Sequence, residues 1–96
     1  MRSRFTAFAV GDAPYLLSSW HPTTRPDQVR FIPGQAWTRL EILATVAGGA
    51  FDAEGHVEFR AHHEREGRPG VLHELSHFVR HDGSWVYLGP VDADLS

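Results

Sequence analysis

The sequence predicts an α+β domain in which N-terminal helices are followed by an antiparallel sheet of about four strands. Apolar residues recur at helical spacing through residues 2–20, which is typical of short amphipathic helices. Residues 37–46 and 56–66 instead alternate apolar and polar side chains, as half-buried strands do. Asp82-Gly83, a favoured hairpin turn, precedes the aromatic and β-branched residues 85–88, which are expected to form the last strand.

The first helix is expected over residues 2–10, with Phe5, Phe8 and Ala9 on its apolar face. Gly11 follows, and glycine is the usual residue where a helix ends in the left-handed conformation. The first helix is therefore expected to stop at this glycine.

The second helix is expected to begin after Asp12, whose carboxylate can cap it, with Pro14 in the first turn. His21-Pro22 ends this helix, because the residue before a proline is disfavoured in helical conformation. Residues 23–34 are rich in Pro and Gly and predict an extended loop.

The length and composition of the chain exclude several kinds of protein and of binding site. The chain has 96 residues, which we interpret as a single domain spanning residues 1–96. The absence of Cys excludes disulfides and thiolate zinc sites within it. The net charge of −3, with Arg as the only strongly basic residue, argues against nucleic-acid binding. No signal peptide, membrane span or cofactor is predicted, and a cytoplasmic location is expected.

Residues 73–77 match the zinc-protease pattern His-Glu-x-x-His. On a helix, His73 and His77 would bind zinc and Glu74 would activate a bound water, and the apolar spacing of residues 71–79 favours such a helix. The flanking turn signals favour a strand instead. A third zinc ligand would have to come from the few candidates that remain: His81, Asp82, Asp92 and Asp94.

A series of short motifs runs through nearly the whole chain. They are Arg2-Ser3-Arg4-Phe5-Thr6-Ala7-Phe8, Gly11-Asp12, Tyr15-Leu16, Trp20-His21-Pro22, Val57-Glu58-Phe59, His73-Glu74 with Ser76 and Phe78, and Asp82-Gly83 with Trp85 and Tyr87. In these motifs the chain resembles the central domain of YchJ-like bacterial proteins, which belongs to the nuclear-transport-factor-2-like superfamily. The resemblance implies a cone in which helices close over a curved antiparallel sheet.

The resemblance also bears on zinc. In that family the segment matching residues 73–78 is a sheet strand, and the position of His77 is commonly Arg, which cannot bind zinc. We therefore predict a strand without a metal, and zinc hydrolysis is the function that the sequence favours least. Family members usually carry cysteine-rich zinc motifs outside this domain, and this chain contains no Cys.

The resemblance implies a pocket between the helices and the concave face of the sheet. If residues 66–70 form a turn, Phe59 faces Phe78, Ala61 faces Ser76 and His63 faces Glu74, while Asp82-Gly83 pairs Phe78 with Tyr87 and Arg80 with Trp85. The predicted pocket-lining residues are Trp20, His21, Trp37, Phe59, His63, Glu74, Ser76, Phe78 and Tyr87.

His63 and Glu74 are the candidate catalytic residues, because a carboxylate beside an imidazole makes an acid–base pair. The pair would serve a small-molecule lyase or isomerase. The interpretation that we favour is a cross-strand ion pair in a non-catalytic module that binds an unknown small molecule or protein.

Two further groups of residues can each be interpreted in two ways. The open sheet face carries His62, His73, Leu75 and Val79, and it would suit a homodimer. The histidines at 62, 73 and 77 could bind a metal together only if they were adjacent. In the expected register they are not all adjacent, so no metal site is predicted. Arg2 and Arg4 either bind an anion or are exposed and pair with a carboxylate such as Asp12.

Overall fold

The computed structural model describes residues 1–91; residues 92–96, which include Asp92 and Asp94, lie outside the described part. Two helices precede four strands. They are α1 (Arg2–Val10), α2 (Ala13–Ser18), β1 (Gln35–Ala47), β2 (Glu54–Arg65), β3 (Arg68–His81) and β4 (Ser84–Pro90).

The ends of both helices follow the predicted signals. Gly11 ends α1 in the left-handed conformation, with φ of 76°. Asp12 caps α2, because its Oδ1 accepts a hydrogen bond from the backbone N–H of Tyr15 at 3.1 Å. The predicted apolar face of α1 needs one correction: Ala9 is exposed, and the buried residues of the helix are Arg4 and Ala7.

The strands form one antiparallel sheet in the order β1-β2-β3-β4. The predicted pairs Phe78–Tyr87 and Arg80–Trp85 between β3 and β4 are both confirmed. A tight turn of Asp82 and Gly83, both with positive φ, sets this register.

The predicted register between β2 and β3 is wrong. Residues 66–70 do not form one long turn, because Glu66 and Gly67 alone connect the strands, with φ of 54° and 75°. Phe59 therefore pairs with Glu74 instead of Phe78. A shift of this size, an even number of residues, leaves every side chain on its expected face and changes only its partner.

The His-Glu-x-x-His segment lies within β3. Alternation along the strand places His73 and His77 on one face of the sheet and Glu74 on the other. The strand prediction is therefore confirmed, and these three residues cannot form the zinc and water site of a helical metalloprotease.

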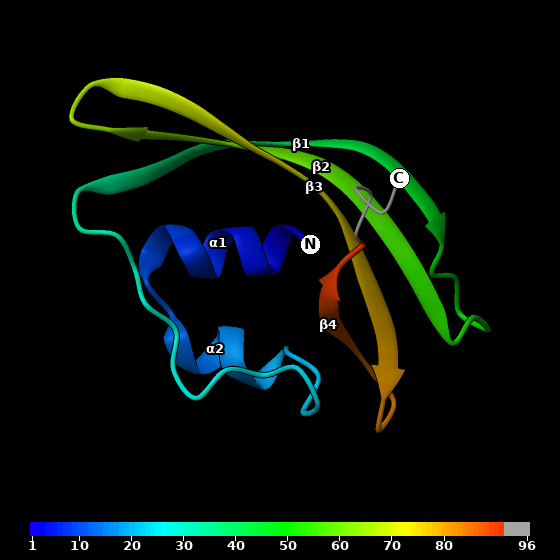
Figure 1. Ribbon diagram of the computed structural model, residues 1–96. Helices are drawn as coiled ribbons and strands as arrows, with labels where there is room; N and C mark the ends of the chain where they lie inside the picture. The colour runs from blue at the N-terminus through cyan, green and yellow to red at the C-terminus, as the bar shows by residue number, and fades with distance from the viewer. Residues whose placement is uncertain (92–96) are drawn as a thin grey trace.

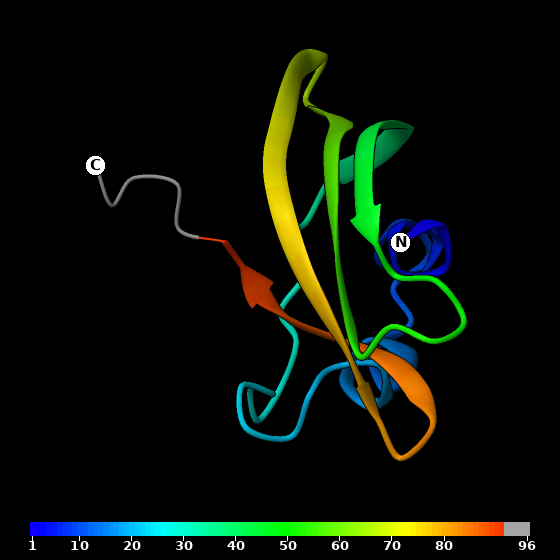
Figure 2. The same cartoon turned by 90° about the vertical axis from the view of Figure 1, so that its right-hand side faces the viewer.

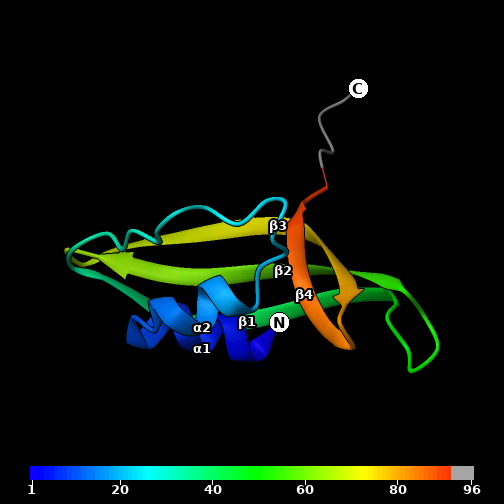
Figure 3. The ribbon, with the colours of Figure 1, turned by 90° about the horizontal axis from the view of Figure 1, so that it is seen from below.

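The sheet is curved, and both helices lie on its concave side (Figures 1 and 3). The long strands β2 and β3 twist along their length, and β4 turns back at one end of the sheet (Figure 2). The core forms between the layers, where Leu16 of α2 and Phe59 and Ala61 of β2 are buried. Neither helix within residues 1–91 has the length and hydropathy needed to cross a membrane.

Candidate functional site

A cavity of about 240 Å³ lies between the helices and the concave face of the sheet. Its walls are mainly aromatic and aliphatic. The apolar side chains come from all layers of the fold: Phe5 and Phe8 of α1, Trp20 after α2, Trp37 of β1, Phe59 and Ala61 of β2, Leu72 of β3 and Tyr87 of β4. Larger hollows on the described surface are more open to solvent.

One end of the cavity is polar. Glu74 Oε2 accepts hydrogen bonds from Ser76 Oγ at 2.5 Å and from the Tyr87 hydroxyl at 2.8 Å. Burial, together with the hydrogen bond to Glu74, raises the pKa of Tyr87 well above its usual value. Tyr87 is therefore a protonated donor at neutral pH and orients the carboxylate of Glu74.

Arg4 brings a positive charge to the same cavity from α1. Its Nη1 donates to the carbonyl oxygen of Leu16 at 3.1 Å and to Ser19 Oγ at 2.6 Å. Its guanidinium carbon lies 5.0 Å from the ring centroid of Trp20 and 4.7 Å from that of Tyr87, within range of cation–π attraction. Burial lowers the pKa of Arg4, but a guanidinium stays charged in proteins.

The structure brings six of the nine predicted pocket residues to this cavity. They are Trp20, Trp37, Phe59, Glu74, Ser76 and Tyr87. The other three lie elsewhere. His21 bonds Thr23 and packs against His81, and Phe78 lines a separate hollow beside Trp85.

His63, the third of these, does not meet Glu74. It lies opposite Gly70 in the sheet, whereas Glu74 lies opposite Phe59. The His63 ring packs against Trp37, with centroids 5.1 Å apart, and its Nδ1 lies 3.3 Å from the amide nitrogen of Gln35. The proposed acid–base pair is therefore wrong, because it depended on the incorrect β2–β3 register.

Gly70 is what allows the His63 ring to lie over β3, because a Cβ at Gly70 would overlap the imidazole. Gly70→Ala is expected to lower the free energy of unfolding by about 1–3 kcal/mol, the usual cost of overpacking. In a His63→Ala background the same change should cost less than about 1 kcal/mol. A double-mutant cycle measured by urea denaturation checks the coupling, and equal costs in both backgrounds would contradict this packing.

The cavity also contains residues that were not among the predicted lining: Met1, Arg4, Phe5, Phe8, Ala61 and Leu72. The local pattern gives only part of the signal for Arg4: it lies four residues before Phe8, and residues at this spacing share a helix face. Its expected exposure or pairing with Asp12 is wrong, because the guanidinium turns inward to the backbone of α2. Leu72 was missed because the incorrect β2–β3 register did not place it beside a predicted cavity residue. In the structure it pairs with Ala61.

Comparison with known proteins identifies relatives over almost the whole chain. A family model described as YchJ, middle NTF2-like domain, matches residues 1–90. UPF0225 protein SCO1677 of Streptomyces coelicolor is 55% identical over 87 residues, which are 91% of this chain and 67% of that protein. A UPF0225 protein of Streptomyces avermitilis is 51% identical over 88 residues, or 92% of this chain and 60% of that protein.

A solved structure has the same fold. The solution structure of RPA3114, a SEC-C motif containing protein from Rhodopseudomonas palustris, matches with a TM-score of 0.80 and 27% sequence identity. The match covers 98% of this chain and 76% of that one. The chain thus spans 60–67% of the two Streptomyces relatives and three quarters of the solved chain. From the family match over residues 1–90 and these identities, the chain belongs to the family of the YchJ middle NTF2-like domain.

Proposed function

We propose that the domain is a binding module without catalytic chemistry, and that its cavity takes a small, largely apolar, neutral molecule with one hydrogen-bond donor. The observation that carries this proposal is the cavity itself, with aromatic walls and a single polar end at Glu74. Its volume of about 240 Å³ is below the roughly 300–1,000 Å³ typical of pockets for drug-sized ligands. A single-ring compound therefore suits it best.

The charges support a neutral ligand. Arg4 and Glu74 face the same cavity with opposite charges, and the Tyr87 ring and hydroxyl link them. A charged ligand would attract one of the two groups and repel the other. A donor on the ligand can instead reach Glu74 Oε1, which receives no hydrogen bond from the side chains of residues 1–91.

A binding titration with phenol and toluene tests the proposal. Both rings are similar in size, but only phenol carries a donor. We expect phenol to shift the amide NMR signals of Phe59, Ser76 and Tyr87. Glu74→Gln should weaken phenol binding about tenfold, since a hydrogen bond to a charged group contributes about 1.5–3 kcal/mol. Toluene binding should change less than about twofold.

Glu64→Gln is the matched control, because Glu64 is an exposed residue of β2 that does not line the cavity. It should leave the affinity for both compounds unchanged. Shifts confined to residues outside the cavity would contradict the proposal, as would equal weakening of phenol and toluene by Glu74→Gln.

We also propose a homodimer through the outer, convex face of the sheet, and a cytoplasmic location. Exposed Val46 and Val71 lie on this face beside His56 and His62, and a second copy would cover them. Sedimentation velocity over a concentration series tests the dimer, and a single monomeric species at high concentration would contradict it. Fractionation of cells tests the location.

A further inference from the structure

Paired histidine and glutamate side chains are a feature of the outer face of the sheet. His62 Nε2 lies 2.5 Å from Glu41 Oε1, and His73 Nε2 lies 2.7 Å from Glu58 Oε2. Both contacts are hydrogen bonds, so one ring nitrogen of each histidine already has a carboxylate partner. The hydrogen bond from His62 also lowers the pKa of Glu41.

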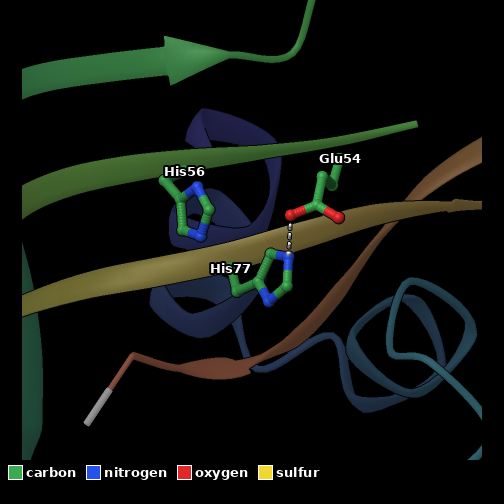
Figure 4. A group of neighbouring side chains, drawn as sticks. All are labelled: Glu54, His56 and His77. Carbon is green, nitrogen blue, oxygen red and sulfur yellow. Dashed lines mark ion pairs between the residues drawn. The ribbon is translucent and has the colours of Figure 1, made fainter. Parts of the chain in front are cut away.

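His77 differs from these two histidines. Its Nε2 lies 3.4 Å from Glu54 Oε1, yet within residues 1–91 this buried nitrogen has no hydrogen-bond partner, because the geometry does not suit a hydrogen bond. The ring of His56 stacks on that of His77, with centroids 4.5 Å apart and planes 13° apart. Figure 4 shows the three side chains together on the same side of β2 and β3.

We propose that Glu54, His56 and His77 form a binding site for a divalent transition metal, with Zn²⁺ as the ion that the donor set suits best. Each residue offers one ligand atom, and these atoms all lie within 4.8 Å of one another. Two imidazole nitrogens and a carboxylate oxygen are a common zinc ligand set, which leaves a fourth position for water.

The separation of the ligand atoms agrees with this assignment. Zinc binds nitrogen and oxygen at about 2.0–2.2 Å, so two ligands on a tetrahedral ion lie about 3.4 Å apart. His77 Nε2 and Glu54 Oε1 already have this separation, at 3.4 Å. All three ligand atoms lie within 4.8 Å of one another, so small side-chain movements would bring the third to this separation.

The backbone explains why these three residues meet. In the β2–β3 register His56 pairs directly with His77, and Glu54 lies two residues before His56 on the same face. Gly89 pairs with His77 from β4 and adds no side chain over the site. Residues of the zinc-protease pattern therefore lie on both faces of the sheet. His77 belongs to the proposed site together with Glu54 and His56 of β2, whereas Glu74 lies on the opposite face.

Calorimetric titration of the tag-free domain with ZnCl₂ tests the site. We expect one Zn²⁺ per chain. His77→Ala and Glu54→Gln should each weaken binding at least about tenfold, since even residues that only support metal ligands contribute 10–100-fold. Co²⁺ should give the absorption bands of a tetrahedral site, whereas Mg²⁺, which prefers oxygen ligands, should not bind.

His73→Ala is the matched control, because it removes an outer-face histidine of the same strand that is already paired with Glu58. It should bind Zn²⁺ as the unaltered chain does. The proposal is overturned if the chain takes up no Zn²⁺, or if His73→Ala weakens binding as much as His77→Ala.

A second measurement guards against variants that fail to fold. In the unaltered domain, Zn²⁺ should shift the imidazole nitrogen signals of His56 and His77 in NMR spectra, while those of His73 stay in place. If none of the imidazole signals moves at one equivalent of Zn²⁺, the stacked rings are a packing feature only and the site is refuted.

Discussion

Replacing Leu16 with alanine is expected to lower the free energy of unfolding by about 2–5 kcal/mol. Leu16 is 0% exposed and is the main buried residue of the short helix α2, Ala13–Ser18. Truncation removes buried apolar area and leaves a cavity that the surrounding structure fills only in part. Each kcal/mol lowers the melting temperature of a domain this size by about 4–8 °C. Urea denaturation followed by circular dichroism measures the change.

Leu43→Ala is the control for this prediction, because it deletes the same atoms from a residue of β1 that is 39% exposed. Its cost should stay near or below about 1 kcal/mol. Similar costs at both positions would mean that α2 is not anchored through Leu16. Loss of the α2 anchor should also weaken phenol binding, since Trp20, which lines the cavity, lies two residues after the end of this helix.

Structural features that depend on a few neighbouring residues could be predicted from the sequence. Gly11 and Asp12 set the boundary between the helices, because each satisfies backbone groups at a helix end. Asp82-Gly83 set the β3–β4 register, since two adjacent residues that tolerate positive φ favour one tight turn. Strand alternation predicts the face of the sheet on which Phe59 lies, and the expected turn at residues 66–70 places Ser76 on the same face.

The β2–β3 register could not be predicted in this way, because two adjacent dipeptides both favour a turn. Glu66-Gly67 and Pro69-Gly70 are both typical of turns. The structure uses the first and extends β3 through the second. The choice depends on packing between residues far apart, such as His63 over Gly70, and it decides whether His63 meets Glu74 and whether His56 meets His77.

Burial of Arg4 likewise could not be predicted from local pattern, because it requires acceptors supplied by α2. Arg4→Ala is expected to lower the free energy of unfolding by about 3 kcal/mol. The change removes two hydrogen bonds from a charged donor, one of them to the buried carbonyl of Leu16. It also removes the contacts of the guanidinium with Trp20 and Tyr87 and the packing of the side-chain stem.

Three further variants separate these contributions. Arg2→Ala deletes an exposed arginine of the same helix and should cost less than about 0.5 kcal/mol. Arg4→Met keeps the apolar stem, and Arg4→Lys keeps the charge but lacks the planar fork of donors, so both should fall between Arg2→Ala and Arg4→Ala. Equal costs for Arg2→Ala and Arg4→Ala would show that the interior charge does not hold α1 against α2. If the costs instead follow the expected order, Arg4 is the residue that holds both helices over the cavity. It is then also the positive charge that lies in the same cavity as Glu74.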